Sequence, residues 1–103
     1  MRRIRYSNTF DRQLAGYIEL GEVAFGVAVA HAKKALVYAT IRTIIASNPR
    51  LKSPDPVLGL VVYPIAKTPF IVVYDYDEAE LRMHFIFQKG KSLDDLDPAS
   101  VVW

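Results

Sequence analysis

The sequence predicts an α+β fold in the order β-α-α-β-β-β, with a helical hairpin packed on one face of a mainly antiparallel sheet. Two observations lead to this class. Apolar residues recur at helical spacing through the first half of the chain, and short connections join three apolar runs in the second half. A chain of 103 residues is long enough for one small core. We expect residues 1–103 to form a single domain, with residues 91–103 as a docked C-terminal tail.

The N-terminal segment predicts a strand followed directly by a helix. Arg3-Ile4-Arg5-Tyr6 alternates polar and apolar side chains, which is typical of a half-buried strand over 2–6. Ser7 then stands where an N-cap is needed. The helical spacing of Phe10, Leu14, Tyr17 and Ile18 predicts a helix over 8–20. Gly21 is expected to end this helix.

The second predicted helix runs from Glu22 or Gly26 to Ser47 and carries two apolar stripes. The bulky stripe consists of Val37, Tyr38, Ile41, Ile44 and Ile45. The small-residue stripe consists of Ala28, Ala32, Ala35 and Ala39. A helix of this kind can pack closely on a neighbouring helix while its bulky side covers a sheet. The two helices are therefore expected to form an antiparallel hairpin.

Three strands are predicted after the proline-rich loop over 49–56. They lie at 58–63, 69–75 and 80–88, and their short connections favour an antiparallel meander. Strict alternation in the last strand places four apolar side chains on one face, namely Leu81, Met83, Phe85 and Phe87. We expect this face to meet the helices. Arg82 and His84 are expected on the opposite, open face.

Composition excludes several classes of chemistry. The chain has no cysteine, so it has no disulfide, thiolate metal site or thiol nucleophile, and a reducing cytoplasm fits. No apolar run approaches the roughly 20 residues that a membrane-spanning helix needs. Its two histidines, His31 and His84, are far apart, and Gly90-Lys91-Ser92 lacks the earlier glycine of a phosphate loop. We therefore expect neither a metal site nor a cofactor.

Charge is distributed unevenly along the chain. Residues 1–67 hold ten Lys/Arg against four Asp/Glu, whereas residues 75–103 hold three against seven. A candidate anion-binding patch combines the open face of the last strand with nearby loops, and its members are Lys67, Arg82, His84, Lys89 and Lys91. The alternative is that Arg82 pairs with Glu80 or with an acid on the neighbouring strand.

The C-terminal segment is too apolar for a free end. We expect it to dock on the body through Leu93, Leu96, Val101, Val102 and Trp103, with Trp103 as the anchor. Asp97-Pro98 is typical of an N-cap followed by proline at the first helical position, which predicts a short terminal helical turn.

Several segments together resemble the RelE/ParE superfamily of bacterial toxins. They are Ile4-Arg5-Tyr6-Ser7 with Phe10-x-x-Gln13-Leu14, Ile44-Ile45-Ala46-Ser47-Asn48-Pro49, Pro69-Phe70-Ile71-Val72-Val73-Tyr74 and Leu81-Arg82-Met83-His84-Phe85-Ile86-Phe87. The closing Leu93-x-x-Leu96-Asp97-Pro98-Ala99-Ser100-x-x-Trp103 is similar to tails of ParE-like, plasmid-stabilisation-type members. The resemblance implies a type II toxin that a ParD-like antitoxin neutralises, in a hetero-oligomer with that antitoxin.

Two branches of the superfamily differ in chemistry. RelE-like members cleave mRNA on the ribosome, with a basic cluster and a Tyr or His near the end of the last strand. ParE-like members act on DNA gyrase and have no established hydrolytic site. This sequence has Phe87-Gln88 where the Tyr or His is expected, and it lacks an arginine in the strand over 58–63. Those departures and the long helical hairpin favour the ParE-like branch.

The resemblance thus implies inhibition of DNA gyrase by binding, without catalysis. The alternatives are a ribosome-dependent mRNA endoribonuclease that would use Arg82, His84 and Lys91, and a degenerate toxin that only binds its antitoxin. The expected target contacts are Lys67, Arg82, His84, Lys89, Lys91 and Trp103. The expected antitoxin contacts are Ala28, Ala32, Ala35 and Ala39.

Overall fold

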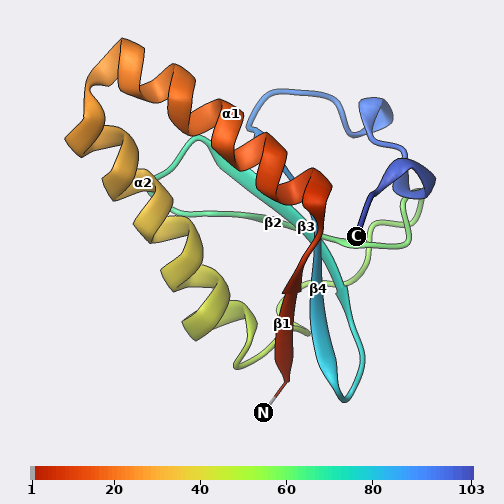
Figure 1. The fold of residues 1–103 in the computed structure, drawn as a ribbon. Coiled ribbons are helices and arrows are strands. Elements are labelled where there is room, and N and C mark those ends of the chain that lie inside the picture. Colours follow the sequence, from red (N-terminus) through yellow and green to blue (C-terminus); the bar gives the residue numbers. More distant parts are fainter. Residues whose placement is uncertain (1) are drawn as a thin grey trace.

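A four-stranded sheet carries two helices on one face (Figure 1). The computed structural model describes residues 2–103. Its helices and strands are β1 (Arg3–Tyr6), α1 (Asn8–Phe25), α2 (Val27–Thr40), β2 (Val61–Pro64), β3 (Phe70–Tyr76) and β4 (Glu80–Gln88). The strand order is β1-β4-β3-β2, with β1 parallel to β4 and the other neighbours antiparallel. The predicted α+β class and element order are confirmed.

Two side chains of the first helix tie it to the centre of the sheet. Ser7 Oγ accepts a hydrogen bond from the Phe10 amide at 2.8 Å, as an N-cap does, and donates to the His84 carbonyl at 2.7 Å. Nearly two turns later, Gln13 Oε1 accepts a hydrogen bond from the amide of Ile86 at 3.0 Å. Because β1 ends before it reaches this part of β4, the Gln13 side chain gives that strand amide a partner.

The first helix does not stop at Gly21, contrary to the prediction. It continues to Phe25 and ends at Gly26, whose φ of 93° lies in the region that favours glycine. Gly21 instead sits where the two helices approach each other. A Cβ at Gly21 would lie 3.5 Å from the Cβ of Ala30. The extra turn carries apolar side chains beyond the sheet and leaves them exposed.

The second helix begins at Val27, directly after Gly26, which was one of the two predicted starts. Its α-helical part ends at Thr40 and a π-helical turn follows over Ile41–Ile45, short of the predicted end at Ser47. Of the predicted bulky stripe, Val37, Ile41 and Ile45 are fully buried. The hairpin therefore covers the sheet with most of the predicted face. Tyr38 is half-buried, whereas the prediction was wrong for Ile44, which is 45% exposed on the π-helical turn.

The strand predicted over 58–63 begins later, at Val61. The Asp55 carboxylate accepts the amides of Val57 and Leu58 at 2.9 and 3.0 Å, and Gly59 has a φ of 70°. These contacts hold the preceding residues in a turn, so they cannot join the sheet. Strands β3 and β4 match the predicted ranges 69–75 and 80–88 to within one residue.

A β-bulge interrupts the pleat of β4. Tyr74 pairs with Met83 but its neighbour Val73 pairs with Phe85, so His84 is an extra residue on this strand. Beyond the bulge, the order of inward and outward side chains is reversed. The prediction of one continuous apolar face was wrong for this reason, because it assumed strict alternation along the whole strand.

The two faces of the sheet belong to different apolar clusters. Toward the helices, the core includes Leu81, Met83 and Ile86. On the other face a second cluster is formed by Leu60, Val73, Phe85 and Phe87. The C-terminal segment covers this second cluster with Leu93, Leu96 and Val101, and Figure 1 shows it in blue on the side away from the helices.

Backbone hydrogen bonds fasten the end of the chain to the start of α1. The Val102 carbonyl accepts the amide of Asn8 at 2.7 Å, and the Val102 amide donates to Thr9 Oγ1 at 3.0 Å. Asp97 caps the short 3-10 turn Pro98–Ser100, as its spacing predicted. None of the helices in the described chain has the length and hydropathy of a bilayer span.

Candidate functional site

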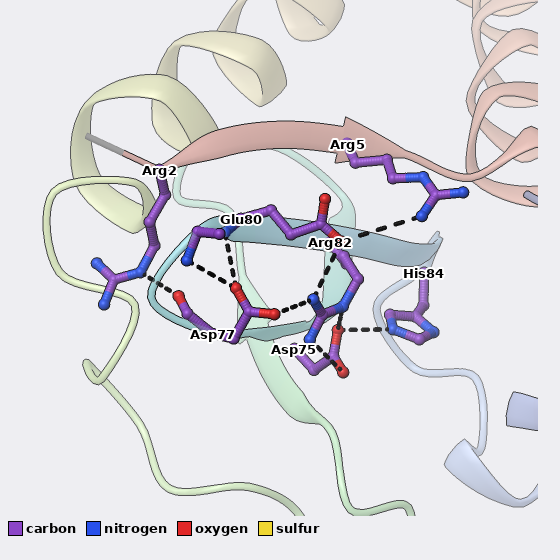
Figure 2. A network of polar contacts seen from close by, with 8 residues as sticks. Arg2, Arg5, Asp75, Asp77, Glu80, Arg82 and His84 are labelled. Carbon is purple, nitrogen blue, oxygen red and sulfur yellow. Dashed lines mark hydrogen bonds and ion pairs between the residues drawn. The ribbon is translucent and has the colours of Figure 1, made fainter.

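Arg82 lies at the centre of a carboxylate cluster on the sheet face turned away from the helices (Figure 2). Its guanidinium makes two hydrogen bonds to Asp75 on the facing strand, of 2.8 and 3.2 Å. It also contacts Asp77 at 2.8 Å and Glu80 at 3.1 Å. We call Asp75, Asp77, Glu80 and Arg82 the arginine clip. A bidentate arginine–carboxylate pair of this kind is a strong and directional contact.

Three members of the arginine clip have pKa values shifted toward their charged forms. Burial opposes ionisation of Asp75, but hydrogen bonds from Arg82 and His84 outweigh it, so the pKa of Asp75 lies below its usual value. Hydrogen bonds from Arg82 and from the amides of Glu80 and Ala79 lower the pKa of Asp77 to about 2. The same pairs raise the pKa of Arg82 further above its ordinary range. With three carboxylates and one guanidinium, the clip has a net negative charge.

This arrangement leaves Arg82 little capacity to bind an anion. A guanidinium has five N–H donors, and the carboxylates already take most of those of Arg82. An incoming phosphate would have to displace these partners and would be repelled by their charge. The structure therefore has the pairing that the sequence offered as the alternative, in which Arg82 binds Glu80 and a cross-strand acid.

His84 is enclosed between the arginine clip and the C-terminal residue. Its Nε2 lies 2.9 Å from Asp75 Oδ1, and its ring meets the Trp103 ring nearly at right angles, with centroids 4.8 Å apart. The Arg5 guanidinium lies 4.9 Å from the centroid of the same indole. The His84 side chain is only 13% exposed. Among the described residues its Nδ1 has no hydrogen-bond partner.

The candidate residues form two groups rather than one patch. Arg82, His84 and Trp103 lie together, whereas Lys67, Lys89 and Lys91 lie at the other end of β4. At about 3.3 Å per residue, Lys89 is roughly 20 Å along the strand from Arg82. Lys91 turns toward α1, where its Nζ lies 5.5 Å from the Tyr17 ring centroid. The nuclease set of Arg82, His84 and Lys91 is therefore not assembled.

Near these lysines, the tip of the helical hairpin and the end of the sheet enclose an apolar hollow of about 510 Å³. We call it the hairpin groove. Its lining residues include Tyr17, Leu20 and Phe25 of α1, Val29 and Lys33 of α2, and Phe70 of β3. Sequence reasoning missed the groove because Gly21 was taken as the end of the helix, which removed part of its wall.

The alanine stripe lies on the outer side of α2. Ala28, Ala32 and Ala35 are exposed and Ala39 is half-buried. The alanine that packs between the two helices is Ala30, which lies outside the stripe and is 4% exposed. The stripe therefore remains accessible to another molecule.

The sequence offered Glu80 or an acid on the neighbouring strand as a partner of Arg82, but it did not identify Asp75 or Asp77. The signal that could have found them is hairpin register, because residues equally distant from a turn pair across two strands, and Asp75 pairs with Arg82 in this way. Within residues 2–103, no group of three or more histidine, aspartate or glutamate side chains is placed to hold a metal ion.

Comparisons with known proteins give a match in structure but not in sequence. No protein-family model matches the sequence, and no curated protein is significantly similar to it. Among solved structures, the fold is similar to a chain of the "Chromosomal ParDE TA system from P. aeruginosa", with a TM-score of 0.74 and 12% identity. The match covers 85% of this chain and 96% of that chain. At this identity the likeness establishes the fold, and it is the fold that the RelE/ParE resemblance implied.

Proposed function

We propose that this chain is the toxin of a type II toxin–antitoxin pair and that it inhibits DNA gyrase by binding, in the cytoplasm. The observation that carries the proposal is the fold likeness to a chain of a ParDE toxin–antitoxin system over 85% of this chain. That likeness extends over 96% of the other chain, so the two have nearly the same set of elements. The sequence resemblance to ParE-like toxins points the same way.

The state of Arg82 supports inhibition by binding over cleavage of mRNA. Catalytic stabilisation of a scissile phosphate needs donors that are free to meet the developing charge. Arg82 instead holds three carboxylates. Phe87, where a proton-transferring Tyr or His would be expected, lies in the apolar cluster under the tail. These features disfavour the alternative of a ribosome-dependent endoribonuclease.

The outer surface of the helical hairpin supports binding of an antitoxin. The alanine stripe offers a smooth face on which another helix can pack closely. Next to it, the hairpin tip exposes large apolar side chains, including Leu20, Val23, Phe25 and Val27. Exposed apolar surface of this extent is typical of a protein interface. We propose that a ParD-like antitoxin covers it in a hetero-oligomer.

For contact with the target we propose the other face of the molecule. Trp103 is 38% exposed and presents an aromatic surface beside Arg5. Aromatic and arginine side chains are the residues that most often dominate binding at interfaces. In this proposal Arg82 orders Asp75, which holds the His84 ring against Trp103. The other expected target contacts, Lys67, Lys89 and Lys91, lie at the far end of β4 and are not part of this surface.

Expression in bacteria tests this function. Induction of the chain alone should arrest growth, and co-expression with the small protein encoded in the adjacent reading frame should relieve the arrest. Ala32→Arg and Ala35→Arg place bulky charges on the exposed stripe, so they should abolish relief while the arrest persists. Glu19→Arg, on an exposed position of α1, is the matched control and should leave relief intact. Normal growth on induction of the folded chain would contradict the proposal.

A further inference from the structure

A second hollow, of about 630 Å³, lies between β1 and the end of the second helix. Its lining residues are Arg2, Ile4, Arg42, Ala46 and Ser47, and we call it the β1 hollow. Arg2 and Ile4 come from the start of the chain, whereas the other three belong to the π-helical turn and the residues that follow it. Segments far apart in the sequence thus bring two guanidinium groups to one cavity.

The Arg2 side chain is held in place by neutral groups. Its Nε donates to the Asp77 carbonyl at 2.7 Å, and its guanidinium carbon lies 5.5 Å from the centroid of the Tyr76 ring. Figure 2 shows its two terminal nitrogens turned away from the arginine clip. All but one of the N–H donors of a guanidinium are on these two nitrogens. Within residues 2–103 they have no hydrogen-bond partner, so they are available to the oxygen atoms of a ligand.

Arg42 lies on the π-helical turn, and turns of this kind are frequent at functional sites. Its side chain is exposed and forms no ion pair with any described carboxylate. Its charge reaches β1, because it opposes the increase that burial causes in the pKa of Tyr6. The carbonyls at a helix end carry only about half an elementary charge. Since none of the described residues that line the hollow is acidic, two guanidinium charges leave it positive.

The charge and the donors of the β1 hollow suit a phosphate monoester. An arginine fork binds a pair of oxygens on a carboxylate or a phosphate. One fork satisfies both oxygens of a carboxylate, whereas a phosphate monoester has three acceptor oxygens and a charge of about −2. Two guanidiniums therefore match the monoester better in both respects. The volume of the hollow exceeds that of a phosphate, and Ile4 and Ala46 supply an apolar wall for an attached organic group.

We propose that the β1 hollow binds a phosphate monoester carried by a small organic molecule, with the phosphate between Arg2 and Arg42. A nucleoside monophosphate is a ligand of this class. Ser47 adds no donor, because its hydroxyl already donates to the Thr43 carbonyl. The inference needs neither DNA gyrase nor an antitoxin, so it is tested separately from the proposed function.

Three adenosine compounds test this chemistry by isothermal titration calorimetry with the purified full chain. AMP carries a monoester, cyclic AMP carries a diester with a single charge, and adenosine carries no phosphate. We expect AMP to bind about tenfold or more tightly than cyclic AMP, and adenosine not to bind. The affinity for AMP should fall as NaCl rises from 50 to 300 mM. Equal affinities for AMP and cyclic AMP, or no binding of AMP at about 5 mM, would overturn the proposal.

Substitutions show whether AMP occupies the β1 hollow. Arg2→Gln together with Arg42→Gln should weaken AMP binding about tenfold or more, because both arginine forks are lost. Arg12→Gln together with Lys52→Gln removes the same charge from exposed positions outside the hollow and is the matched control. Unchanged affinity in the first variant, or an equal loss in the control, would reject the hollow as the site.

A second measurement locates the ligand without any substitution. In ¹⁵N–¹H correlation spectra of the wild-type protein, AMP should shift the amide signals of Ile4 and Ala46, which line the hollow. The signal of Val23, exposed at the tip of the helical hairpin, should not move. Shifts at Val23 without shifts at Ile4 and Ala46 would overturn the assignment.

Two oligonucleotides distinguish a free nucleotide from the end of a nucleic acid as the source of the phosphate. One is an oligothymidylate with a 5′-phosphate, and the other is the same chain with a 5′-hydroxyl. Tighter binding of the phosphorylated chain supports recognition of a monoester, and its affinity relative to that of AMP identifies the source. Equal binding of the two chains, both tighter than AMP, would show that backbone charge is recognised and would overturn the proposal.

Discussion

His84, the extra residue in the bulge of β4, packs edge to face against Trp103, the last residue of the chain, with ring centroids 4.8 Å apart. The bulge turns His84 and Phe85 toward the same face of the sheet. One then meets the terminal indole and the other lies in the cluster that the tail covers. The irregularity in the strand and the docking of the tail are therefore parts of one arrangement.

The tail should stabilise the fold through Trp103. Trp103→Ala removes an aromatic contact with His84 and a cation–π contact with Arg5, and we expect a loss of about 1–2 kcal/mol in the free energy of unfolding. Chemical denaturation followed by circular dichroism measures it. Val102→Ala changes the neighbouring, largely exposed side chain and should have an effect within about 0.5 kcal/mol. Equal losses in the two variants would contradict an anchoring role for Trp103.

Removal of residues 93–103 should be more damaging than any single substitution. It exposes Phe85 and Phe87 and removes the backbone hydrogen bonds from Val102 to the start of α1. A loss of about 2 kcal/mol or more corresponds to a fall in melting temperature of about 10 °C. A melting curve that matches the full chain would show that the tail contributes nothing to the core.

Arg82→Ala should destabilise the protein because it leaves three carboxylates facing one another. We expect a loss of about 2 kcal/mol, between the values typical of exposed and buried ion pairs. Arg3→Ala, at an exposed arginine on β1, is the control and should change stability by less than about 0.5 kcal/mol. Urea denaturation of the two variants makes the comparison. A neutral Arg82→Ala would mean that the arginine clip does not stabilise the hairpin.

Acid should weaken the fold through the same carboxylates. On folding, the pKa of Asp77 falls from 3.8 to about 2, and that of Asp75 falls as well. Between these values the unfolded chain binds more protons than the folded one, so stability is complete above about pH 5 and decreases as the pH falls toward 2. Melting temperatures from pH 7 to pH 2 should show this decline.

Asp77→Asn should make that acid decline shallower and lower the melting temperature at pH 7. Glu78→Gln, at an exposed acid in the same turn, is the control and should keep the slope of the wild-type protein. Identical slopes for the wild-type protein and Asp77→Asn would contradict the assignment of the lowered pKa to this carboxyl.

Two glycines in the hairpin should respond in opposite ways to alanine. Gly26 has a φ of 93°, so Gly26→Ala should cost about 1 kcal/mol or more. Gly16 lies inside α1, and a Cβ there would meet nothing within 4 Å. Gly16→Ala should therefore stabilise the protein by about 0.5–1 kcal/mol. Thermal melts of the two variants test where the first helix ends.

Local patterns predicted the elements that local forces determine. Ser7 was identified as an N-cap and Asp97 as the cap of the terminal turn, because capping needs only a short polar side chain before a helix. The helical hairpin and the last two strands followed from apolar spacing. Gly21 was misassigned because a glycine that allows close helix packing and a glycine that ends a helix are identical in sequence.

The candidate site depended on relations that periodicity does not contain. Strict alternation could not predict the bulge at His84, so it assigned Phe85 and Phe87 to the wrong face. The arginine clip required the register between β3 and β4, which is fixed by the whole hairpin. Arg82 and His84 were correctly placed on the face away from the helices, because the alternation holds up to the bulge.

The most direct test of the central claim is the effect of the purified chain on two isolated targets. DNA gyrase is assayed for ATP-dependent supercoiling of relaxed plasmid, and ribosomes carrying a defined mRNA are assayed for cleavage of that message. We predict that the chain inhibits supercoiling and leaves the mRNA intact. Ribosome-dependent cleavage of the mRNA, with gyrase unaffected, would contradict the account and identify the chain as an endoribonuclease.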